Sequence, residues 1–170
     1  MRDKINELQR MGMLAVYNFS EMKGEKIQKV INMLIDWLLY NLDEIKKYIK
    51  EMDYLGAGTV YGDGIVNEET DLLERDIIEI EEAKQIIKSV EDSIKSLDDQ
   101  AFYIYIDRYH SNLKYSEIAD FEGISEITVK RKIKKIRQEV EDGFSRDDIT
   151  FDSILALRKK LRDIRLKKVS

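Results

Sequence analysis

Residues 115–142 read YSEIADFEGISEITVKRKIKKIRQEVED, and this stretch decides the fold predicted for the chain. A close crossing of two helices needs a small residue, which Ala119 provides. The turn between them needs a residue that tolerates left-handed backbone, which Gly123 provides four positions later. Ser125 is a natural N-cap, and Val129 supplies a branched apolar residue six positions after the glycine. This spacing predicts a helix-turn-helix.

The second helix of this motif has an apolar side and a strongly basic side. Its expected inward stripe steps by four, three and four residues through Val129, Ile133, Ile136 and Val140. From Lys130 to Arg137 the chain has six basic residues and no acidic one. Like charges four positions apart destabilise an isolated helix, so an ordinary solvated helix face is the less favoured alternative. The charge excess favours a helix that lies in the major groove of duplex DNA.

One family pattern runs through this region without a gap. It consists of Leu97, the Arg108-Tyr109 pair, Leu113, YSEIADFEGIS at 115–125 and TVKRKI at 128–133. Over residues 97–140 the chain therefore resembles region 4 of sigma-70 family factors, and the resemblance implies a module that reads the promoter −35 element. The wider arrangement of the chain is similar to that of small phage-encoded transcription regulators of the ArpU type.

The motif assigns DNA contacts to one side and the flanks of its second helix. The expected DNA-binding residues are Ser125, Glu126, Ile127, Thr128, Lys130, Arg131, Lys132, Lys134, Lys135 and Arg137. Of these, Lys130, Arg131 and Lys134 are expected to face the groove, with Arg131 the best candidate for a paired contact to guanine. Ser125 and Thr128 would hold a backbone phosphate. Lys132, Lys135 and Arg137 would add phosphate contacts from the flanks, and Glu126 would either accept from cytosine or cap the helix.

Residues 1–96 are expected to form an antiparallel helical hairpin. One helix is predicted over about 22–51, because its apolar positions from Ile27 to Ile49 recur every three or four residues. The second stripe runs through Leu73, Ile77, Ile80, Ala83, Ile87, Val90, Ile94 and Leu97. A Gly-rich loop near 53–69 would join the helices. A phosphate-cradling loop is disfavoured, because the helix that follows begins with acidic residues.

The net charge of −5 is an average over regions of opposite sign. Residues 63–99 contain thirteen acidic and four basic residues, so this segment is either a solvated helix face or a docking surface for a protein. After an expected helix break at Gly143, residues 143–170 form a basic C-terminal helix with an apolar side at Phe151, Ile154, Leu155, Leu161 and Ile164. This helix would close the fold, cover the acidic hairpin or contact the DNA backbone.

Composition excludes several classes of protein. The chain has no cysteine and one histidine, so thiolate or histidine metal sites are not expected, and no cofactor or catalytic constellation is predicted. No secretion signal or membrane-spanning segment is evident, and a cytoplasmic location is expected. The sequence therefore predicts an all-α, non-enzymatic regulator that binds double-stranded DNA, with RNA polymerase or a second copy as possible partners of its N-terminal helices. The alternative is an adaptor that binds a protein through the acidic hairpin without specific DNA contact.

Overall fold

The computed structural model describes residues 24–59 and 68–169, and within these ranges every regular element is helical. This confirms the all-α fold class. In chain order the elements are α2 (Gly24–Tyr40), α3 (Leu42–Thr59), α4 (Glu68–Lys95), α5 (Asp99–Tyr105), the π-helical turn η2 (Ile106–His110), α6 (Tyr115–Glu122), α7 (Glu126–Arg146) and α8 (Phe151–Val169). In the described ranges no helix is long and apolar enough to span a bilayer.

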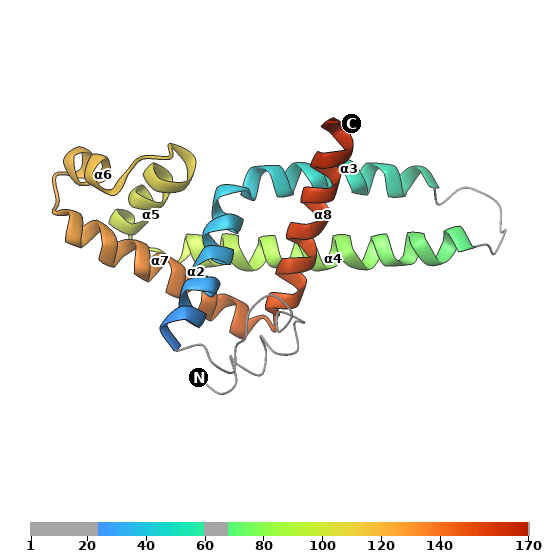
Figure 1. The fold of residues 1–170 in the computed structure, drawn as a ribbon, viewed down its shortest axis with the longest axis horizontal. Helices are drawn as coiled ribbons and strands as arrows, with labels where there is room; N and C mark the ends of the chain where they lie inside the picture. The colour runs from blue at the N-terminus through green and yellow to red at the C-terminus, as the bar shows by residue number, and fades with distance from the viewer. Residues whose placement is uncertain (1–23, 60–67, 170) are drawn as a thin grey trace.

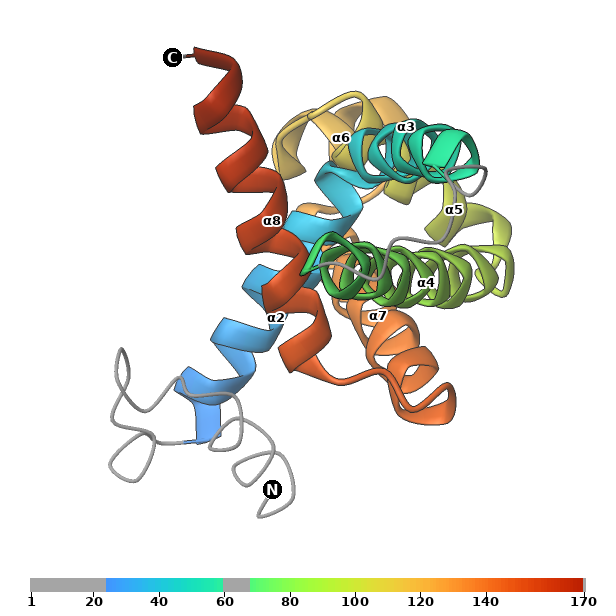
Figure 2. The same ribbon diagram turned by 90° about the vertical axis from the view of Figure 1, so that its right-hand side faces the viewer.

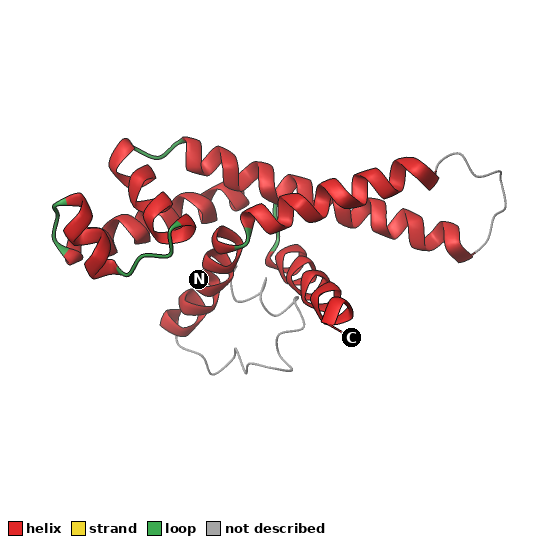
Figure 3. Ribbon diagram, turned by 90° about the horizontal axis from the view of Figure 1, so that it is seen from above, coloured by secondary structure: helices red, strands yellow, loops and turns green. Residues whose placement is uncertain are grey.

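A long hairpin of α3 and α4 extends from one side of the molecule (Figures 1 and 3). The single helix predicted over 22–51 is wrong, because the chain breaks at Asn41 into α2 and α3. The Asn41 backbone N–H donates to both Trp37 O and Leu38 O, at 3.1 and 3.2 Å, and its side-chain amide donates to Trp37 O at 2.7 Å. An Asn amide that bonds nearby backbone competes with the helix in this way. The expected loop near 53–69 is helical up to Thr59 and again from Glu68, and residues 60–67 lie outside the described ranges.

The apolar stripes predicted for the hairpin are largely buried. From Ile27 to Ile49 the expected positions all lie in the core, although they are divided between α2 and α3. On α4, Ile80, Ala83, Ile87, Val90 and Ile94 are buried. Of the remaining stripe residues, Ile77 is 54% exposed and Leu97 is partly buried, while the side chain of Leu73 lies outside the described residues. The period of the sequence identifies one face of α4, which is buried from Ile80 to Ile94 and exposed at Ile77.

Helix α7 packs against four other helices, α2, α4, α5 and α6 (Figure 1). The predicted break at Gly143 is wrong, because α7 continues through it to Arg146. A Cβ atom at Gly143 would lie 2.4 Å from Ser93 Oγ and 3.3 Å from Ser89 Oγ. The glycine therefore serves a close crossing of α7 over α4 and does not end the helix.

The basic helix α8 packs against the acidic helix α4 (Figures 1 and 2). Phe151, Ile154, Leu157 and Leu161 are buried, whereas Leu155 and Ile164 are only partly buried. Lys160 Nζ lies 3.6 Å from Asp76 Oδ1 and 3.4 Å from Glu79 Oε2. Of the roles expected for this helix, these contacts correspond to the cover over the acidic hairpin.

Candidate nucleic-acid interface

The candidate interface is built on α5, η2, α6 and the first half of α7. Asp98 caps α5 by accepting a 2.8 Å hydrogen bond from the Ala101 N–H. The sequence period places Phe102, Ile106 and Tyr109 on the apolar side of this region, with Tyr105 beside them. Tyr105 and Tyr109 are buried, as are Ala101 and Ile104, but Phe102 is 40% exposed and Ile106 only partly buried. The buried residues Ala101, Ile104, Tyr105 and Tyr109 still follow the helical period, so the buried face is displaced by one position from Phe102.

The turn between α6 and α7 has the local conformations that the sequence predicts. Gly123 lies in the left-handed region, with φ 66° and ψ 34°, and its N–H bonds the Ala119 carbonyl. Ser125 caps α7, since its Oγ accepts from the Thr128 N–H at 3.2 Å. The hydroxyls of Ser125 and Thr128 lie 2.8 Å apart at the start of the helix. These two polar side chains are therefore brought together where a phosphate contact was expected.

The inward face of α7 is confirmed by burial. Val129, Ile133, Ile136 and Val140 each have an exposed fraction of 1% or less. This stripe fixes the rotation of the helix, because residues at these steps share one side of it. The opposite side must then face away from α5 and α6.

On that outward side the structure places Lys130, Arg131 and Lys134, which are all exposed. Lys130 Nζ lies 3.5 Å from Glu126 Oε1, one turn earlier, so Glu126 offsets part of the local charge. In the described part of the chain Arg131 and Lys134 form no ion pair. Ile127, in the first turn, is 63% exposed. This outward group of cations and one apolar side chain is a surface that a polyanion can reach.

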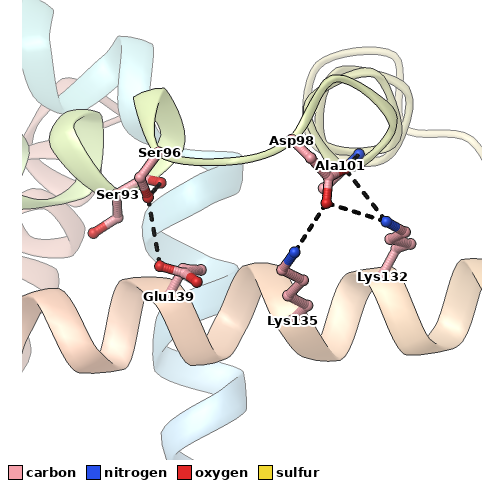
Figure 4. A network of polar contacts seen from close by, with 7 residues as sticks. All are labelled: Ser93, Ser96, Asp98, Ala101, Lys132, Lys135 and Glu139. Atoms are coloured by element: carbon pink, nitrogen blue, oxygen red, sulfur yellow. Dashed lines mark hydrogen bonds and ion pairs between the residues drawn. The ribbon is translucent and has the colours of Figure 1, made fainter.

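Two of the flanking lysines instead point toward α5 (Figure 4). Lys135 Nζ lies 2.9 Å and Lys132 Nζ 3.2 Å from Asp98 Oδ2. Three hydrogen bonds lower the pKa of Asp98 far below its usual range. Their donors are Lys135, the Ala101 N–H and Lys132. Asp98 raises the pKa of Lys135 in turn. Both lysines remain near the protein surface, but a phosphate would have to compete with the carboxylate for them.

Arg137 is turned away from the outward group and toward α2. Its Nε and its terminal nitrogen donate to the two carboxylate oxygens of Asp36, at 2.9 and 2.6 Å. The Tyr109 hydroxyl donates to Asp36 Oδ1 at 2.7 Å. Burial, with the adjacent Asp36 charge, raises the pKa of Tyr109 above its ordinary value. Burial alone would lower the pKa of Arg137, but Asp36 more than offsets this and raises it.

Two residues of this region were not found by sequence reasoning. Asp36 is the partner of Arg137, and the available signal was its position as an acid inside the apolar stretch from Val30 to Leu42. Phe121, on the last turn of α6, is 76% exposed. Its signal was its position beside the buried pair Ile118 and Ala119, but the sequence did not show which side of α6 it takes.

Comparisons with known proteins do not place the chain in a family. No family model, no curated protein and no solved structure matches it. In the described ranges no group of three or more His, Cys, Asp or Glu side chains is placed to hold a metal ion.

Proposed function

We propose that this chain is a sequence-specific DNA-binding transcription regulator that inserts the first half of α7 into the major groove. The observation that carries the proposal is the outward group on α7, in which Lys130, Arg131 and Lys134 are exposed opposite a fully buried apolar stripe. The pattern that resembles sigma-70 region 4 supports the same surface. Such a regulator would act in the cytoplasm.

The contacts divide into base-reading and phosphate-binding residues. Arg131 would donate two hydrogen bonds to guanine, and Lys130 and Lys134 would reach the adjacent base edges or phosphates. Ser125 and Thr128 would bond a phosphate near the positive end of the α7 dipole. Lys132 and Lys135 would contribute only where phosphate displaces Asp98. Arg137 would position α7 against α2 and would not contact DNA, because its guanidinium group is bonded to Asp36.

The proposal includes a protein contact through the N-terminal helices, with RNA polymerase or with a second copy of the chain. It is supported by Ile77 and Ile78, which are 54% and 58% exposed on the acidic helix α4. Exposed apolar side chains within a charged surface are typical of interaction sites. The same observation favours the second candidate function, an adaptor that binds a protein without specific DNA contact.

The deciding experiment is a gel-shift titration with duplexes selected from a random pool by the unaltered chain. Arg131→Ala is expected to weaken binding by about 1–3 kcal/mol and to relax the sequence preference at one position. Lys134→Ala is expected to weaken binding to all duplexes about equally and to reduce the salt dependence of the binding constant by about 1 in its logarithmic slope.

Lys50→Ala is the matched control, because it removes the same charge from an exposed position on α3. It should leave affinity and preference nearly unchanged. If Arg131→Ala behaves like this control, the groove assignment is wrong. If the unaltered chain shows no salt-dependent binding to any duplex, DNA binding itself is wrong and the adaptor function is favoured.

A further inference from the structure

The distal part of α4 presents a surface that the DNA-binding proposal does not use. Glu74, Ile77, Ile78 and Glu81 are all exposed and lie within two turns of the helix; we call them the arm stripe. The two isoleucines lie between the two acids in sequence, so an apolar centre is bordered by negative charge. Glu81 also pairs with Lys84, at 3.1 Å, whereas Glu74 forms no ion pair in the described part of the chain.

The last turns of α8 present a surface of opposite sign. Lys159, Arg162, Leu166 and Val169 are separated by steps of three, four and three, so they share one face of the helix; we call them the α8-end stripe. Leu166 is 63% and Val169 88% exposed. Figure 2 shows the end of α8 projecting beyond the other helices. The stripe therefore combines two cations with two apolar side chains on an accessible projection.

Within one chain the two stripes lie on different sides of α4. Lys160, next to Lys159, pairs with Asp76 and Glu79 on the side of α4 that faces α8, whereas the arm stripe lies on the other side and is exposed. Arg165, at the level of the α8-end stripe, pairs with Glu44 and donates to Asn41 Oδ1 at 2.9 Å, where α3 begins. The ion pairs of Lys46 with Glu91 and of Lys84 with Asp53 show the antiparallel register of the hairpin. In this register the arm stripe lies toward the far end of the hairpin, roughly 24 Å along α4 from the level of Glu44. The α8 end would have to leave its own contacts to reach it.

We propose that two copies of this chain associate, with the α8-end stripe of each copy packed on the arm stripe of the other. The stripes match in charge, and each offers two apolar side chains that gain from burial. Pairing of two arm stripes would place acids against acids. Duplex DNA would satisfy Lys159 and Arg162 but would not bury the exposed apolar surface at the end of α8, where Val169 is 88% exposed. Reciprocal exchange gives a closed two-fold dimer with two identical contacts.

This inference names the partner for the protein contact in the proposed function, and it is tested without DNA. Sedimentation equilibrium of the full chain is expected to give the mass of a dimer at low salt. Higher salt should raise the dissociation constant, because ions screen the charge attraction. A monomer at every concentration in low salt would overturn the proposal, whatever the result of the gel-shift titration.

Charge reversal tests which stripes meet. Glu74→Arg and Arg162→Glu are each expected to raise the dissociation constant about tenfold or more, because each change occurs at both contacts of the dimer. The chain with both changes restores opposite charges at each contact and should regain most of the affinity. Ile77→Ser should weaken the dimer as well, through loss of apolar burial.

Two matched controls separate a specific contact from a change in net charge. Asp92→Arg places the same reversal elsewhere on α4, and Lys29→Glu places it on α2; both positions are exposed. Both should leave the dissociation constant within about twofold of the unaltered value. If the chain with both Glu74→Arg and Arg162→Glu stays as weak as the single variants, the stripes do not pair. If Arg162→Glu weakens duplex binding and the unaltered chain is monomeric, the α8 end contacts DNA instead.

Discussion

Arg137 has the most informative outcome at the scale of single residues. Its position at the end of the basic run predicted a phosphate contact, but its guanidinium forms a two-bond pair with Asp36, and Tyr109 donates to the same carboxylate. The helical period gives the direction in which each charged side chain leaves the helix. It does not give the identity of the neighbour in that direction, which here belongs to α2.

Removal of Asp36 is the direct test of this cluster. Asp36→Ala is expected to lower the free energy of unfolding by about 2–4 kcal/mol, because it leaves both Arg137 and the Tyr109 hydroxyl without their partner in a largely desolvated place. Urea denaturation followed by circular dichroism measures the change.

Asp92→Ala serves as the comparison, since Asp92 is exposed on α4 and should cost less than about 0.5 kcal/mol. Equal losses in the two variants would mean that the cluster contributes no more than an ordinary surface charge.

At the scale of whole elements, the positions where helices end or continue differ from those that residue type predicts. A glycine in a helical pattern suggests a break, yet α7 passes through it because Ser89 and Ser93 of α4 approach its backbone. Asn41, with no glycine or proline beside it, lies at the end of α2, where its side-chain amide competes with the backbone for the Trp37 carbonyl. Residue type alone therefore predicts neither the continuation of α7 at Gly143 nor the end of α2 at Asn41.

Substitution of Gly143 separates packing from helix propensity. Propensity alone would make Gly143→Ala stabilising by up to about 1 kcal/mol. We expect the opposite, a loss of about 1–3 kcal/mol, because the new methyl group would lie 2.4 Å from Ser93 Oγ. Thermal or urea unfolding measures the sign.

The second change Ser93→Ala removes the opposing oxygen and should recover part of the loss. A stabilising Gly143→Ala variant would show that the crossing of α4 and α7 relaxes at no cost.

At the scale of the whole molecule, acidic and basic segments that are separate in the sequence come into contact in the fold. The basic helix α8 packs on α4, with Lys160 near Asp76 and Glu79. Arg165 bonds Glu44, which lowers the pKa of that carboxyl. The net charge of the chain therefore describes neither the outward group on α7 nor the acidic hairpin.

A core substitution in α8 tests whether this helix is part of the folded body. Ile154 is fully buried, and Ile154→Ala is expected to lower the free energy of unfolding by about 2–5 kcal/mol. The salt slope of duplex binding, measured on the folded variant, should not change.

Ile127→Ala makes the same chemical change at a position that is 63% exposed, and its effect on unfolding should be small. A small effect at Ile154 would mean that α8 adds little to the stability of the body.

The sequence alone determined the features that depend on neighbours along the chain. The all-α class, the left-handed Gly123, the Ser125 cap and the buried stripe on α7 all follow from residue type and helical period, which act over a few residues. The tertiary structure decided which helix lies opposite each face. Arg137 pairs with Asp36, and Lys132 and Lys135 pair with Asp98. Gly143 packs against α4, and Ile77 is exposed. These outcomes depend on contacts between distant segments, and such contacts form only when the whole chain packs.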